Sequence, residues 1–255
     1  MTFPLVTQTP PSDELSGTTY PLEFLARDAL LARAHDFASP PLSLEDGADS
    51  RLPETVRARL PQAQAYALAA VARAAASQTK RQAGLASRFA ALQRSNRNTE
   101  HRLEELRQLG DAYTQEVSKV SACRTGCSHC CHIPVFLSAS EAKLIGKQIG
   151  RRPVNLPAGE VHTPGAYGYD RPCTFLKDSR CSIYEHRPMA CRWHFNLDRD
   201  ALLCELIPEL SVPVPLADMR SLQILYTQVT FGDTIADVRD FFPQKAKMPG
   251  APRHT

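Results

Sequence analysis

The sequence has no cysteine before position 123 and none after position 204, although it contains eight in total. No apolar run approaches the ~18 residues that a membrane-spanning helix needs, so no membrane partner is expected. The first residues, MTFPLVTQTPPSDE, have no basic stretch followed by an apolar one and do not indicate a secretory signal peptide. These absences predict a cytoplasmic protein, in which thiols stay reduced and disulfides are not expected.

Motifs of several enzyme classes are also missing. The sequence has no Gly-rich nucleotide loop, no H-E-x-x-H pair and no G-x-S-x-G elbow, so no separate catalytic apparatus or substrate is indicated. The net charge of +3 is too small to indicate a polyanionic partner. Residues 73–107 carry eight Lys or Arg against three Glu, but they lack the interleaved aromatics of nucleic-acid-binding surfaces. We interpret them as a solvated helix face and do not expect nucleic acid as a partner.

The chain just before the cysteines is expected to be helical. Within residues 54–120, apolar side chains recur at intervals of three and four in two seams, the first running through Leu68 and Val71. Polar residues 95–98 separate the seams. This pattern predicts two long helices packed as an antiparallel hairpin that leads directly to Cys123.

Residues 121–205 are expected to form a small module that contains every cysteine. Ser138 and Glu141 form a capping box for a helix that ends at Gly150. In residues 173–184, KDSR lies between two apolar stretches that each begin with cysteine, a pattern that predicts a β-hairpin. The module therefore combines short strands with short helices.

The predicted fold class is mostly α, with a small metal-stabilised α+β cysteine-cluster module and a long antiparallel helical hairpin on its N-terminal side. An acidic, Pro-rich segment with one short helix is expected over residues 1–53, before the hairpin at 54–120. C-terminal helices are expected over 206–243, the last of them from Asp233 onward. A flexible tail over 244–255 ends the chain.

Four of the eight cysteines fall within the nine residues CRTGCSHCC. Cys127 and Cys130 have the spacing of a zinc knuckle, in which two thiolates of a tight turn converge on one ion. Cys130 and Cys131 are adjacent, so we expect their side chains to diverge. They would then serve two separate sites or bind different irons of one cluster. The expected ligands of zinc or iron are Cys123, Cys127, Cys130, Cys131, Cys173, Cys181, Cys191 and Cys204.

Several neighbours of the cysteines are expected to support the metal. A metal bound by four thiolates is anionic, so Arg124, Arg187 and Arg192 are candidates to balance its charge. His129, like three other histidines that lie beside cysteines, is either a ligand or a hydrogen-bond donor near the metal. Cys204 stands apart in ALLCELIP, where an inert buried cysteine is the alternative to a ligand.

The stretch CRTGCSHCC, followed by PCTFLKDSRCSIYEHRPMACR, resembles the YkgJ-like CxxCxxCC family of zinc- or iron-chelating proteins. The resemblance covers about residues 120–205, a third of the chain. It rests on the first cysteine cluster, CRTGCSHCC, and on the later pattern C-x2-L…C-x-I-Y-x-x-R-P-x-x-C-R, which begins at Cys173. It implies bound zinc or iron, with an iron–sulfur cluster such as 4Fe–4S among the forms. It also adds Tyr184 to the residues expected near the metal. Members are often described as iron–sulfur oxidoreductases without a defined reaction.

Three functions fit these residues. The preferred interpretation is a metal-binding protein with a redox or electron-transfer role, and no substrate can be identified. The alternative from another class is a non-catalytic zinc module that scaffolds contacts with a protein partner. The spacing Cys123-x3-Cys127-x2-Cys130 also matches the radical-SAM motif, which binds an iron–sulfur cluster at the start of a parallel β/α barrel. The chain after Cys131 is rich in loops and lacks repeated strand–helix units, so this third function is not expected.

Overall fold

The computed structural model of the chain describes residues 50–76, 84–158 and 167–244. Its helices and helical turns are α2 (Glu54–Ala76), α3 (Leu85–Gln93), α4 (Thr99–Val120), η4 (His129–His132), α5 (Ala139–Ile149), η5 (Tyr184–His186), α6 (Met189–Arg192), η6 (Leu202–Cys204), α7 (Arg220–Val229) and α8 (Val238–Phe241). Its strands are β1 (Phe136–Ser138), β2 (Leu176–Lys177), β3 (Arg180–Cys181) and β4 (Ile235–Asp237). The fold is mostly helical with two small two-stranded sheets, as the sequence predicts. The short helix expected before residue 50 and the tail from residue 245 onward lie outside the described residues.

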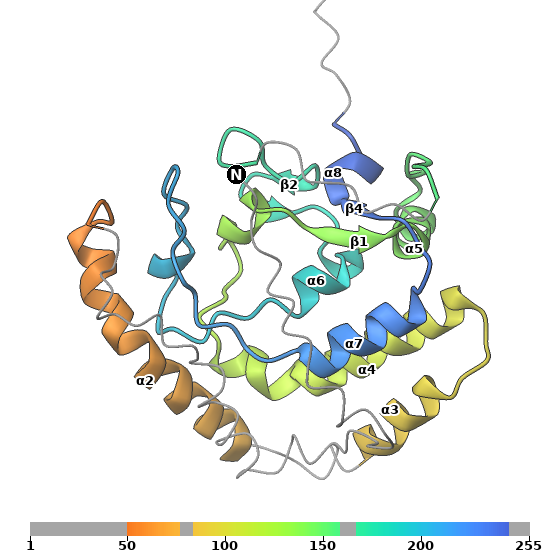
Figure 1. The fold of residues 1–255 in the computed structure, drawn as a ribbon, viewed down its shortest axis with the longest axis horizontal. Helices are drawn as coiled ribbons and strands as arrows, with labels where there is room; N and C mark the ends of the chain where they lie inside the picture. The colour runs from red at the N-terminus through yellow and green to blue at the C-terminus, as the bar shows by residue number, and fades with distance from the viewer. Residues whose placement is uncertain (1–49, 77–83, 159–166, 245–255) are drawn as a thin grey trace, which may run out of the picture.

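Helix α4 is the central element of the fold (Figure 1). The side chain of Asn98 accepts a hydrogen bond from His101 N at 2.9 Å, so α4 begins within the polar break that the sequence predicts. Helices α2, α3, α5 and α7 all contact it. Helix α4 ends at Val120 and delivers the chain directly to the first cysteine.

The first arm of the expected hairpin differs from the prediction. In the described residues it consists of two helices, α2 and α3, whose axes point in different directions (Figure 1). The buried face of α2 also differs, because Leu68 and Val71 are only partly buried. Instead, α2 buries an alanine stripe made of Ala63, Ala67, Ala70 and Ala74. These small side chains allow the backbone of α2 to approach α4 and Leu197 closely. The prediction followed the spacing of larger apolar side chains and therefore missed the face made of alanines.

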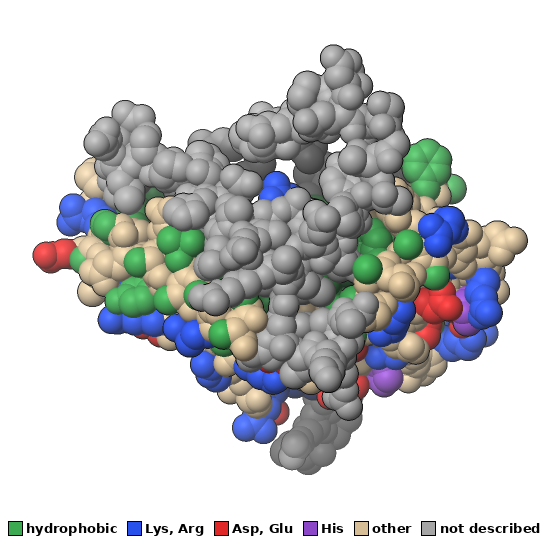
Figure 2. Space-filling model, turned by 90° about the horizontal axis from the view of Figure 1, so that it is seen from below, with side chains coloured by type: hydrophobic (Ala, Val, Ile, Leu, Met, Phe, Trp, Pro, Cys, Tyr) green, Lys and Arg blue, Asp and Glu red, His purple; other side chains and the backbone are tan. Residues whose placement is uncertain are grey.

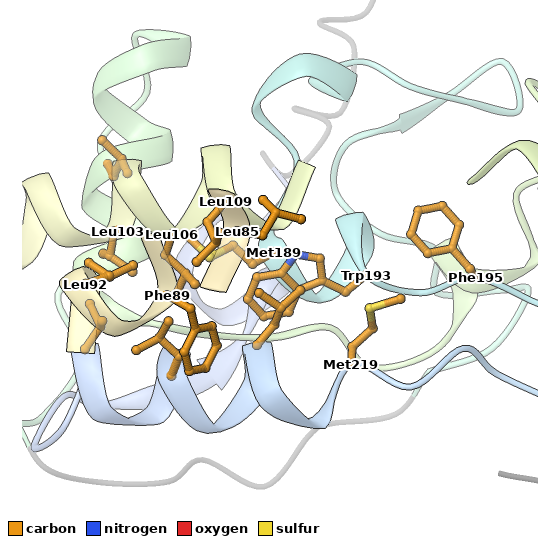
Figure 3. Packing of buried hydrophobic residues seen from close by; sticks show 14 residues of the cluster. Leu85, Phe89, Leu92, Leu103, Leu106, Leu109, Met189, Trp193, Phe195 and Met219 are labelled. Carbon is orange, nitrogen blue, oxygen red and sulfur yellow. The ribbon is translucent and has the colours of Figure 1, made fainter. Parts of the chain in front are cut away.

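The largest apolar core lies between α3, α4 and α7 (Figure 3). Trp193, the only tryptophan of the chain, is buried in it and packs edge-on against Tyr226 with ring centroids 6.2 Å apart. A Cβ atom at Gly110 would lie 2.5 Å from Trp193 Nε1, so α4 needs glycine at this position to accept the indole ring. Because Trp193 directly follows α6, this core also fixes the position of α6.

A second apolar core supports the strands and part of the cysteine module. The side chain of Ser138 accepts from Glu141 N, and α5 ends at Gly150 with a left-handed φ of 66°, as predicted. The second bond of the predicted capping box does not form, because Ser138 N donates to the Tyr226 hydroxyl and the Glu141 carboxylate accepts from Met189 N and Tyr226. Strand β1 pairs antiparallel with β4, with Leu137 opposite Ala236.

Strand β4 corrects the expectation of a continuous C-terminal helix from Asp233 onward. Residues Ile235–Asp237 are extended, and only Val238–Phe241 form the short helix α8. The extended residues pair with β1, which lies far away in the sequence. This pairing provides hydrogen-bond partners for their backbone N–H and C=O groups, and the local sequence pattern gives no sign of such a distant partner. The prediction of helix at these three residues is therefore wrong.

Two other sequence-based expectations concern large-scale features. Both sheets formed by the described residues are antiparallel, so this part of the chain contains no parallel β/α barrel of the radical-SAM type. None of its helices combines the length and the apolar character needed to cross a membrane.

On the described part of the face in Figure 2, Lys and Arg side chains are spread along both flanks among polar and acidic side chains. That distribution is typical of a solvated surface.

Candidate metal centre

Seven of the eight cysteines line one cavity of about 930 Å³. They come from the loop after α4, from η4, from the β2–β3 region and from α6. The lining cysteines are Cys123, Cys127, Cys130, Cys131, Cys173, Cys181 and Cys191. All eight cysteines are free thiols in the structure. The fold therefore gathers thiols from distant parts of the module around one space.

These thiols surround the cavity without closing on a single point. Within the described ranges, no three Cys, His, Asp or Glu side chains converge closely enough to hold one ion.

The loop after α4 brings Cys123 and Cys127 to the cavity. Ala122 N donates to Asn196 O at 2.7 Å, which holds the start of the loop against a distant segment. Cys127 N donates to Arg124 O at 3.0 Å and closes a tight turn. Gly126 has a φ of 90° in this turn, a conformation that favours glycine.

The adjacent residues Cys130 and Cys131 both reach the cavity from the 3₁₀ turn η4. A hydrogen bond from the Cys131 thiol lowers the pKa of Cys130 to about 7, and the nearby Arg187 cation contributes in the same direction. The two side chains therefore do not diverge as expected. The tight turn holds both sulfurs on the same side of the backbone, where they interact.

The β-hairpin and α6 supply the remaining lining thiols. A two-residue turn at Asp178 and Ser179 closes the predicted hairpin, and both residues have the positive φ, 46° and 57°, of a type I′ turn. This turn holds Cys181 at the end of β3. Helix α6 begins directly after Pro188 and carries Cys191.

Burial keeps most of these thiols protonated. It raises the pKa of Cys123, Cys173 and Cys181 above the ordinary value of 9.0, and the effect is larger for Cys191. Metal ligation requires thiolates, so binding would release protons from these groups. Cys130 differs from these thiols, because the hydrogen bond from Cys131 lowers its pKa.

Arg187 is the cation best placed to balance thiolate charge. It lines the cavity, and its positive charge lowers the pKa of Cys130 and Cys181. Its guanidinium stacks on the exposed ring of Tyr184, 3.8 Å from the centroid. The Nε atom of Arg187 is buried without a hydrogen-bond partner among the described residues. This arrangement leaves a donor for an anionic occupant of the cavity.

The other predicted supporting residues have different surroundings. Arg124 donates to the carbonyl oxygens of Ser121 and Cys123 and stiffens the loop itself. His129 Nδ1 lies 2.9 Å from the hydroxyl of Tyr169, and His129 is not among the residues that line the cavity. Of the four histidines beside cysteines, His194 is the one in the cavity lining, and burial lowers its pKa so that the imidazole is neutral.

Arg192 holds the α6 region to α4. It lines the cavity, but its guanidinium donates to both carboxylate oxygens of Asp111, at 3.0 and 3.2 Å. It also donates to the carbonyl oxygens of Arg187 and Glu185. The planar fork of arginine allows these bonds to form together. Arg192 is therefore a positioning residue for the segment that contains Cys191.

Glu141 and Asn196 were not identified from the sequence as residues near the site. The buried Glu141 carboxylate accepts from Met189 N at 2.7 Å and from the Tyr226 hydroxyl at 2.6 Å. It thereby joins α5 to α7 and to the first residue of α6. Asn196 is 1% exposed and contacts Cys204, as described below. The capping box identifies Glu141 only as a residue at the start of α5, and Asn196 belongs to no recognisable local motif, so only the tertiary contacts reveal their place near the site.

Glu141 should make the stability of the protein depend on pH. Burial raises its pKa from 4.5 to about 7, so the folded state keeps a proton that the unfolded state loses in this range. The free energy of unfolding should therefore fall, by on the order of 3 kcal/mol, as pH rises from about 4.5 to about 7. Glu141→Gln should lack this component. Urea unfolding of both proteins at several pH values, followed by Trp193 fluorescence, measures the difference, with exposed Glu100→Gln as control. An identical pH dependence in Glu141→Gln and the wild type would contradict this assignment.

Comparison with known protein families identifies the region that contains the cysteines. Residues 122–205 match the model of the CxxCxxCC family, whose description reads "Putative zinc- or iron-chelating domain". This range begins at the loop after α4 and ends just after Cys204, so it contains all eight cysteines. The comparisons with curated proteins and with solved structures give no match.

Proposed function

Because residues 122–205 form a CxxCxxCC domain, we propose that this chain is an iron–sulfur protein with an electron-transfer role in a reducing, cytoplasmic environment. The observation that carries the proposal is the cavity of about 930 Å³, which seven thiols from separate segments of the domain line. A 4Fe–4S cluster binds four thiolates, each on a separate iron, and so suits donors that are spread around its edges. Such a cluster supplies one-electron oxidation and reduction.

The chemistry of the surrounding residues fits an anionic cluster. Cysteine thiolates are the ligands that iron–sulfur clusters use. Arg187 offers a positive charge and a free Nε donor, and hydrogen bonds and charges near the sulfurs tune the potential of such centres. The apolar side chains of Phe175, Ile183 and Val238 form part of the cavity wall and reduce the access of water.

A zinc module that scaffolds a protein partner is the second candidate. It is favoured by the position of four thiols, which pack against the second apolar core, as structural zinc ligands do when they stabilise a small fold. These are Cys131, Cys173, Cys181 and Cys191. Thiolates suit zinc as well as iron, so the donor set is compatible with both functions.

The metal content of anaerobically purified protein distinguishes the two functions. For the iron–sulfur function we expect brown protein that contains iron together with acid-labile sulfide, and whose visible absorbance is bleached reversibly by a reductant. Colourless protein with stoichiometric zinc would replace this proposal by the zinc scaffold. Protein that retains neither metal after anaerobic purification would contradict both.

A further inference from the structure

The segment His194–Asn196 brings Cys204 next to the first cysteines. Asn196 O accepts from Ala122 N at 2.7 Å, and the Cys123 thiol lies 3.7 Å from His194 O. On the other side, Asn196 Nδ2 donates to Cys204 Sγ at 3.2 Å. One buried asparagine thus connects the loop that carries Cys123 to the turn that carries Cys204.

Cys204 is close to three thiols of the first cluster. It interacts electrostatically with Cys123, Cys127 and Cys130. Cys123 in turn interacts with Cys127 and Cys130. Cys204 does not line the main cavity, yet its neighbours are cavity thiols. A location among three other thiols distinguishes Cys204 from an inert core cysteine.

Helix α2 holds the turn of Cys204 in place. Arg59, which is 5% exposed, donates to Asp198 at 2.9 Å and to both carboxylate oxygens of Asp200 at 2.9 and 3.0 Å. Asp200 O accepts from Asn196 Nδ2, and Leu203 packs against α2 in a separate apolar cluster. The N-terminal helical region therefore positions a cysteine that lies more than a hundred residues later in the chain.

The other four thiols form a separate set around the second apolar core. Cys173 N donates to Cys131 O at 2.7 Å. Cys131, Cys181 and Cys191 pack against this core, and Cys173 belongs to it. Cys123, Cys127, Cys130 and Cys204 are not part of that cluster of described residues. Cys130 lies at the boundary, because it contacts Cys131 and also interacts with Cys181 and Cys191.

We infer that the domain holds two neighbouring four-thiolate centres, an inference that rests on the proposed metal-binding function. The first centre consists of Cys123, Cys127, Cys130 and Cys204, and the second of Cys131, Cys173, Cys181 and Cys191. Under the proposed function, each centre holds one iron–sulfur cluster bound by four thiolates. This division assigns one of the two adjacent cysteines, Cys130 and Cys131, to each centre.

Paired serine substitutions test the division through the metal retained per chain. Cys204→Ser and Cys127→Ser should each lose about half of the wild-type metal, and the double variant of these two should lose the same half. Cys204→Ser combined with Cys181→Ser should lose nearly all of it, because the two ligands belong to different centres. Full retention by Cys204→Ser would show that Cys204 is no ligand. Complete loss in any single variant would show one shared centre.

A second measurement needs no substitution and therefore does not depend on a variant that folds. Metal is removed stepwise from the wild-type chain with a chelator under anaerobic conditions, and free thiols are alkylated and located by tandem mass spectrometry. We expect the eight cysteines to become labelled as two sets of four, divided between Cys130 and Cys131. Labelling of all eight together, or of sets with other members, would overturn the division. A wild-type chain that holds no metal before chelation would instead contradict the proposed function itself.

Discussion

Removal of the metal should unfold the cysteine domain while the helices around α4 stay folded. The core between α3, α4 and α7 contains no cysteine among its described members, so its packing does not depend on thiolate ligation. The second core includes Cys173 and packs against three further thiols. Structural metal contributes on the order of 10 kcal/mol to the folding of small modules, about as much as the stability of a whole domain. Loss of metal should therefore remove most of the order in those parts of residues 122–205 that do not belong to the cysteine-free core.

Circular dichroism and limited proteolysis after anaerobic chelation test this expectation. The helical signal should fall only in part, and cleavage sites should appear within residues 122–205 but not within Thr99–Val120. The fluorescence of Trp193 offers an internal check, because this residue follows α6 but is buried in the cysteine-free core. A complete loss of helical signal on chelation would show that the helices depend on the metal. No new cleavage would show that the domain is stable without it.

Arg192→Ala should destabilise the protein by on the order of 3 kcal/mol. Removing one partner of a buried ion pair costs about 3–5 kcal/mol, and we take the lower end because the Asp111 side chain is 46% exposed. The change also leaves the carbonyl oxygens of Glu185 and Arg187 without their donor. Arg192→Lys should recover only part of the loss, because an ammonium group cannot match the fork of donors. Urea unfolding followed by Trp193 fluorescence provides the measurement.

A surface ion pair supplies the control for this experiment. Lys147 and Glu100 are 2.7 Å apart, and their side chains are 71% and 57% exposed. Lys147→Ala should therefore change the free energy of unfolding by no more than about 1 kcal/mol. Equal effects of Arg192→Ala and Lys147→Ala would mean that the contacts of Arg192 add little to the positioning of α6.

Local features of the chain were readable from the sequence because their causes lie within a few residues. The start of α4 at Asn98, the capping of α5 by Ser138 and its end at Gly150 are decided by hydrogen bonds and backbone conformations of neighbouring residues. The β2–β3 hairpin is equally local. The spacing of the cysteines likewise identified the segment that matches the CxxCxxCC family model.

Features that depend on distant segments were decided only by the tertiary structure. Residues Ile235–Asp237 form a strand because β1 offers backbone partners, and α2 buries alanines because α4 requires a close approach. The grouping of thiols is the clearest case. In sequence Cys204 stands alone among apolar residues, but Asn196 and the ion pairs of Arg59 hold its turn beside the first cluster. Sequence spacing thus determines which residues can bind a metal, whereas contacts between remote segments determine which of them meet.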